Sequence, residues 1–93
     1  MDPREESILA AADIAREAEA MSRATLDRDF DEARFRASLI VDKAAAAGLD
    51  RVACAAARAL ERLGPVGARP HSNYGEAVLR VASAMDALWF DQH

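Results

Sequence analysis

The chain has one cysteine among its 93 residues, which excludes a disulfide framework and a cysteine-based metal cluster. No stretch approaches the roughly 18 apolar residues that a membrane-spanning helix needs. The first residues, MDPREESI, lack the apolar core of a signal peptide. We therefore expect a soluble, cytoplasmic protein with no membrane partner.

The chain also has fewer basic than acidic residues. Twelve lysines and arginines stand against 16 aspartates and glutamates, and the net charge of −4 argues against a nucleic-acid partner. Eleven of the twelve basic residues are arginines, and 23 residues are alanines. A GC-rich coding sequence produces this bias, so we expect a bacterial origin.

The chain is rich in residues that favour helices, and no alternating apolar stretch predicts a strand. Its length suffices for one domain. We expect a single domain over residues 1–93 that is all-α, an antiparallel four-helix bundle. The predicted helices cover residues 3–26, 30–47, 50–63 and 73–92.

Capping residues set these boundaries. Asp2 and Asp29 are the expected N-caps of the first two helices, Gly48 ends the second in a left-handed conformation, and Asp50 caps the third. The end of the first helix has no glycine or proline signal. The alternative is one unbroken helix over residues 3–47 in an extended hairpin that dimerises to bury its apolar faces.

Helical spacing predicts which apolar residues face the core. On the first helix we expect Ile8, Ala12, Ala15, Ser22 and Leu26. On the others we expect Phe30, Ala33, Ala37, Ile40, Ala44 and Ala47, then Val52, Ala56, Ala59 and Leu63, then Tyr74, Val78, Val81, Met85 and Leu88. Trp89 and Phe90 either close the end of the bundle or form a homodimer contact.

The second helix carries a second apolar feature. With Ala37 facing the core, Phe35 and Leu39 point almost directly away from it and lie one turn apart. An apolar pair with a polar rim, opposite the core, is typical of a surface that docks a partner. The alternative is that another helix covers this side. The expected rim consists of Ser38, Asp42, Arg36 and Lys43.

The segment ASLIVDKAAAAG, from Ala37 to Gly48, resembles the central motif of histidine-containing phosphotransfer (Hpt) domains. These domains are four-helix bundles that relay phosphate between histidine kinases and receiver domains. Ala37, Ile40, the alanine run, Gly48 and Val52 fall in register with that motif. The resemblance implies a protein partner, a receiver or kinase domain, bound through the helix that carries Ser38.

This sequence departs from the motif at its reactive positions. Ser38 stands where the phospho-accepting histidine is expected, Val41 where the lysine is, and Asp42 where the glycine is. A serine phosphate ester does not transfer its phosphate reversibly as a phosphohistidine does. We therefore expect an adaptor that binds without relaying phosphate. Its expected partner-binding residues are Phe35, Ser38, Leu39, Val41 and Asp42.

Other chemistry-bearing residues do not form a motif. His71 lies in a predicted loop and His93 at the end of the chain, and neither has a second potential metal ligand one turn away. Cys54 has no neighbouring histidine or basic cluster to activate it. We expect no enzyme activity, no cofactor and no metal. The alternative function is a self-associating module, or a partner-binding helper of the antitoxin or secretion-chaperone kind.

Overall fold

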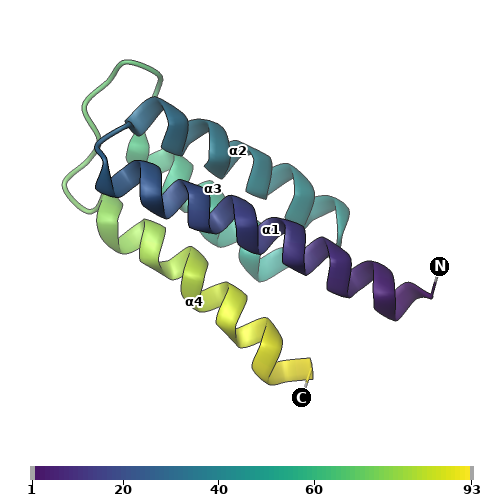
Figure 1. The fold of residues 1–93 in the computed structure, drawn as a ribbon. Coiled ribbons are helices and arrows are strands. Elements are labelled where there is room, and N and C mark those ends of the chain that lie inside the picture. The colour runs from purple at the N-terminus through teal and green to yellow at the C-terminus, as the bar shows by residue number, and fades with distance from the viewer. Residues whose placement is uncertain (1, 93) are drawn as a thin grey trace.

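The computed structural model describes the backbone of residues 2–92 and the side chains of residues 2–88. Over this range the chain forms four antiparallel helices and no strand, as predicted for a four-helix bundle (Figure 1). The observed limits lie within one residue of the predicted ones. The helices are α1 (Pro3–Leu26), α2 (Phe30–Ala46), α3 (Asp50–Leu63) and α4 (Tyr74–Gln92).

The break between α1 and α2 depends on one residue in an unusual conformation. Arg28 has a φ of 60°, in the left-handed region that non-glycine residues seldom occupy. This turn lets the Asp29 amide donate to the Ala24 carbonyl oxygen at 2.8 Å. The Asp29 side chain then accepts from the Glu32 amide, as an N-cap does. Two separate helices therefore replace the alternative of one unbroken helix.

The short link from α2 to α3 follows the predicted glycine turn. Gly48 has a φ of 74°, and the Leu49 amide donates to the Ala44 carbonyl oxygen at 2.8 Å. Leu49 folds back against the core. The prediction that Asp50 caps α3 is wrong, because Leu49 occupies the cap position and Asp50 is already helical.

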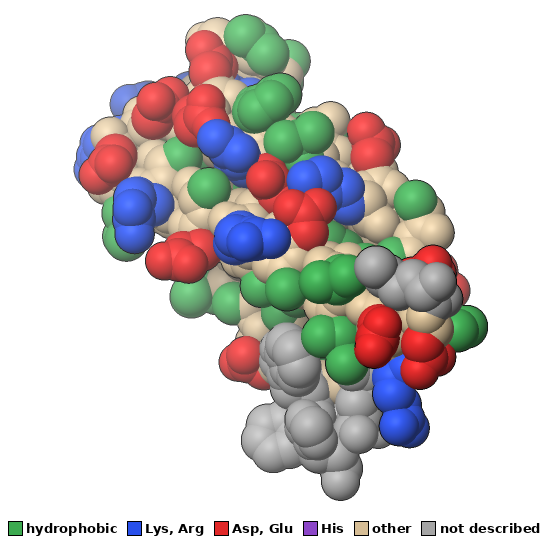
Figure 2. Space-filling view, turned by 45° about the vertical axis from the view of Figure 1, so that its right-hand side comes forward, with side chains coloured by type: hydrophobic (Ala, Val, Ile, Leu, Met, Phe, Trp, Pro, Cys, Tyr) green, Lys and Arg blue, Asp and Glu red, His purple; other side chains and the backbone are tan. Residues whose placement is uncertain are grey.

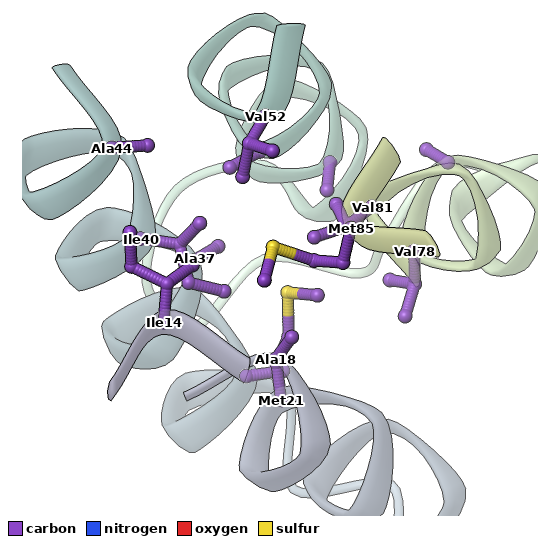
Figure 3. Packing of buried hydrophobic residues seen from close by; sticks show 14 of the residues in the cluster. Ile14, Ala18, Met21, Ala37, Ile40, Ala44, Val52, Val78, Val81 and Met85 are labelled. Atoms are coloured by element: carbon purple, nitrogen blue, oxygen red, sulfur yellow. The ribbon is translucent and has the colours of Figure 1, made fainter. Parts of the chain in front are cut away.

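The core is built largely from alanine. Ala33, Ala37, Ala44, Ala56 and Ala59 are completely buried. Such small side chains let neighbouring helices pack closely, with interaxial distances toward the short end, about 8 Å, of the usual range. The larger core residues fill the space between the helices, and Figure 3 shows Met21 of α1 and Met85 of α4 pointing toward each other there. They are Ile14, Met21, Ile40, Val52, Leu63, Val78, Val81 and Met85.

The predicted inward face of α1 is wrong. Ile8 is 44% exposed and Leu26 is 84% exposed, whereas Ile14 and Met21 are completely buried. Alanine lies on every side of this helix, so its neighbours decide which face is buried. The buried residues of α1 are Ala11, Ile14, Ala18, Met21 and Ala24.

The predicted core faces of the other helices are confirmed, with differences at their ends. All four residues expected on α3 are buried, as are Val78, Val81 and Met85 of α4. Ala47 at the end of α2 is exposed. The expectations for Trp89 and Phe90 concern side chains outside the described residues.

The described bundle is compact. Its Cα radius of gyration is 12.9 Å, and its extents are 43 × 21 × 20 Å. The α1–α2 link and the α3–α4 connection lie at one end, and the two chain termini lie at the other (Figure 1). At the end that holds the α1–α2 link, which we call the link end, Phe30 and Tyr74 meet edge to face with their ring centroids 5.3 Å apart. None of the helices in the described range is both long enough and apolar enough to cross a membrane.

Candidate docking surface

The predicted apolar pair on α2 lies outside the core. Ala33, Ala37, Ile40 and Ala44 occupy the buried side of the helix with no exposed area. Phe35 is 54% exposed, whereas its predicted partner Leu39 is half-buried. About half of the Phe35 surface is therefore open to solvent, and the alternative that another helix covers this side stays open for Leu39.

Three further predicted residues share this side of α2. Ser38 and Asp42 are exposed, and Leu39 is half-buried one turn after Phe35. Together, Phe35, Ser38, Leu39 and Asp42 form what we call the α2 outer surface. Val41 is not part of it, because its half-buried side chain packs against the core.

An ion-pair network ties the α1-facing edge of α2 to its neighbour. The Arg36 guanidinium lies 3.1 Å from Glu17 of α1 and 2.7 Å from Glu32. The Lys43 ammonium lies 2.9 Å from Asp13 and 3.7 Å from Glu17. Figure 2 shows basic and acidic side chains side by side across one face of the molecule. The two cations predicted in the rim thus form ion pairs with α1.

These pairs raise the pKa of both cations. The hydrogen bond to Glu17, followed by that to Glu32, raises the pKa of Arg36 above its usual range. The hydrogen bond to Asp13 raises the pKa of Lys43 above 10.5. Both groups therefore stay charged at physiological pH. The Arg36 guanidinium also lies 5.5 Å from the Phe35 ring centroid, within cation–π range.

Arg34 anchors the link end of the bundle, and the sequence analysis missed it. The residue is only 4% exposed. Nε donates to the carbonyl oxygens of Leu63 and Gly64 at 3.2 and 2.9 Å. Nη2 donates to those of Leu63 and Ala68, both at 2.6 Å. A cation thus satisfies carbonyls at the C-terminal end of α3, where the helix dipole favours positive charge.

Asp31 completes this anchor. Its carboxylate accepts from Arg34 Nη1 and from the backbone amide of Gly67 at 3.2 Å. Residues 64–68 are therefore held to the first turn of α2 through both side chains. The Asp31–Arg34 spacing of three residues was the one sequence signal for this pair.

Among the described residues, the other chemistry-bearing side chains singled out from the sequence lie in the α3–α4 connection and on α3. No group of three or more histidine, cysteine, aspartate or glutamate side chains within the described range lies where it could hold a metal ion. His71 is exposed in the connection, where its backbone amide donates to the Arg62 carbonyl oxygen at 2.9 Å. Cys54 is an exposed free thiol on α3. The prediction that no basic cluster neighbours it is wrong, because the surface groove that Cys54 lines also contains Arg51, Arg58 and Arg62. The strongest candidate site is the α2 outer surface.

Comparison of the chain with protein-family models, with curated proteins and with solved structures finds no match. The resemblance to Hpt domains therefore stays a prediction from the segment Ala37–Gly48.

Proposed function

We propose that this chain is a non-catalytic signalling adaptor of the bacterial cytoplasm that binds a protein partner through the α2 outer surface. The observation that carries the proposal is the exposed ring of Phe35, on the side of α2 opposite its alanine core face. An aromatic side chain is a common energetic centre of protein interfaces. Phe35 is one of five aromatic residues in the chain, and it stands one turn from the apolar side chain of Leu39 rather than alone on the surface.

The surroundings of Phe35 support a docking role. Exposed Ser38 and Asp42 supply a polar rim, and half-buried Leu39 extends the apolar centre. The ion pairs of Arg36 with Glu17 and Glu32 hold this part of α2 against α1. A surface ordered before binding loses less conformational entropy on association.

The expected partner is a receiver or histidine-kinase domain. In the Hpt family, the phospho-accepting histidine lies within the receiver-docking surface. Ser38 stands at the matching position of this sequence, and its exposed side chain lies on the same surface as Phe35. The serine hydroxyl cannot support a reversible phosphoramidate, so binding without phosphate relay is the proposed activity.

The test measures binding of purified receiver and kinase domains from the organism that encodes this chain. Phe35→Ala with Leu39→Ala should weaken binding by at least about tenfold, since central interface residues contribute about 2 kcal/mol or more. Leu79→Ala removes an apolar side chain that is 69% exposed on α4 and should leave binding unchanged. Ser38→Ala should also bind normally.

Two outcomes would overturn the proposal. One is that no receiver or kinase domain binds the wild-type chain. The other is that Phe35→Ala with Leu39→Ala binds as tightly as Leu79→Ala does.

A second candidate function is self-association. Ile8 and Leu9 are adjacent on α1, and they are 44% and 55% exposed. Two such side chains at one end of the bundle favour a contact between copies. Sedimentation equilibrium of the wild-type chain and of Ile8→Ser with Leu9→Ser tests this. A wild-type monomer at concentrations near 1 mM would exclude this function.

A further inference from the structure

A groove with a volume of about 860 Å³ runs between α3 and the first part of α4. None of the residues of the α2 outer surface lines it. Its lining is unusually rich in arginine for a chain with a net charge of −4. The charged residues that line it are Arg51, Arg58, Arg62 and Arg80, with Asp50, Glu61 and Glu76.

The three arginines of α3 form one line along the groove. Arg51, Arg58 and Arg62 are separated by seven and four residues, which places them on the same side of the helix. At 1.5 Å of rise per residue, the line is about 16 Å long. Arg80 stands across the groove on α4.

These three arginines share the groove with the carboxylates of Asp50 and Glu61 but form no ion pair within the described part of the chain. By contrast, Arg80 pairs with Glu76 at 3.0 Å, and Arg34 and Arg36 of α2 are also paired. Neighbouring guanidinium groups of like charge repel one another. An anion placed among them would remove that repulsion and gain charge-assisted hydrogen bonds.

We propose that the α3–α4 groove binds an extended acidic segment of a partner protein, whose carboxylates pair with Arg51, Arg58 and Arg62. The length of the arginine line favours a ligand with several separated carboxylates over a single small anion. Among the described residues, none that lines the groove has an aromatic side chain on which a nucleic-acid base would stack. This site is independent of the α2 outer surface.

The test uses a fluorescent peptide of about twelve residues in which most positions are glutamate. Fluorescence anisotropy should show binding to the wild-type chain at low salt that weakens as salt rises toward 0.15 M. Arg58→Gln with Arg62→Gln should weaken binding by at least about tenfold, as loss of paired interface charges does. Arg51→Gln provides a second variant of the same line.

The matched control is Arg4→Gln with Arg16→Gln. These changes remove two positive charges of α1 that are also exposed, and neither residue lines the groove. Binding of the acidic peptide to this control should stay close to that of the wild-type chain. Circular dichroism of every variant verifies that the helices are retained.

Cys54 gives a local readout, because it is the only cysteine of the chain and lines the groove. The acidic peptide should slow alkylation of Cys54 by a neutral maleimide in the wild-type chain. The same peptide concentration should protect Cys54 much less in the variant with Arg58→Gln and Arg62→Gln.

Three outcomes would overturn the proposal. The first is no peptide binding at low salt. The second is equal weakening in the groove variant and the α1 control, which would indicate attraction to the whole chain. The third is protection of Cys54 by tripolyphosphate at lower concentrations than by the peptide, which would assign the groove to a phosphate ligand.

Discussion

Arg34 Nη2 donates to the carbonyl oxygen of Leu63 at 2.6 Å, and this contact joins the first turn of α2 to the last residue of α3. The two residues are 29 positions apart in the chain. The same guanidinium also reaches Gly64 and Ala68. One buried side chain therefore fixes how the α3–α4 connection leaves the bundle.

Arg34→Met should strongly destabilise the protein. It leaves the carbonyl of Leu63 without its buried side-chain partner and removes charge-assisted hydrogen bonds, at a cost of about 2–4 kcal/mol in unfolding free energy. Urea denaturation followed by circular dichroism measures this loss. Arg34→Lys should recover only part of the lost stability, because an ammonium group lacks the planar array of donors of a guanidinium. Equal stability of Arg34→Met and the exposed control Arg58→Met would contradict the anchoring role.

Arg28→Gly should stabilise the protein. Arg28 holds a φ of 60°, which costs a non-glycine residue about 1 kcal/mol or more. Glycine adopts this conformation without that cost. For a domain of this size, a gain of 1 kcal/mol raises the melting temperature by about 4–8 °C.

Gly48→Ala is the matched control for Arg28→Gly. An added Cβ at Gly48 would meet no atom within 4 Å, so the loss comes from the left-handed backbone alone. This change should lower the melting temperature. Shifts in the same direction for both substitutions would contradict the assignment of backbone strain to Arg28.

Phe35→Ala alone should change unfolding free energy by less than about 0.5 kcal/mol, as surface substitutions usually do. Ile40→Ala, one turn further along α2 but completely buried, should cost about 2–5 kcal/mol. Leu39→Ala should fall between them because Leu39 is half-buried. Thermal melting of the three variants checks this order. A Phe35→Ala loss comparable to that of Ile40→Ala would show that its ring contributes to the core.

The ion pair between Lys43 and Asp13 should make a pH-dependent contribution to stability. The pKa of Lys43 is raised in the folded protein, so its contribution is complete below the unfolded value of 10.5. The contribution is lost as the pH rises through the higher folded-state pKa. The melting temperature of the wild-type chain should therefore exceed that of Lys43→Met at pH 8, and the two should converge at strongly alkaline pH.

Lys43→Arg separates this effect from general alkaline unfolding. A guanidinium stays charged well above pH 11, so this variant should keep its advantage over Lys43→Met where the wild-type chain loses it. A difference between the wild-type chain and Lys43→Met that does not change with pH would contradict an electrostatic origin.

The helix limits could be predicted because their signals are local. Asp29 and Gly48 act within a few residues of their own positions, through a side-chain cap and a left-handed turn. The exposed position of Phe35 could also be predicted, because the alanines of α2 define a single buried side. On α1 alanine lies on all sides, so the sequence did not distinguish Ile8 from Ile14 as the buried residue.

The role of Arg34 could not be predicted in the same way. Its partners are backbone carbonyls 29 to 34 residues away, and every residue has a carbonyl. The ion pairs between α1 and α2 likewise depend on how the two helices align along their axes. That alignment puts Glu17 between Arg36 and Lys43, which helical spacing within one segment does not specify.

The alanine core also limits how this sequence can change over generations. At Ala33, Ala37, Ala44, Ala56 and Ala59 the side chain is a single fully enclosed methyl group. Every replacement except glycine adds atoms, and overpacking typically costs about 1–3 kcal/mol. Relatives of this chain should therefore keep alanine, glycine or serine at these five positions while their surfaces diverge. The spacing of small residues, rather than overall identity, is the pattern by which such relatives can be found.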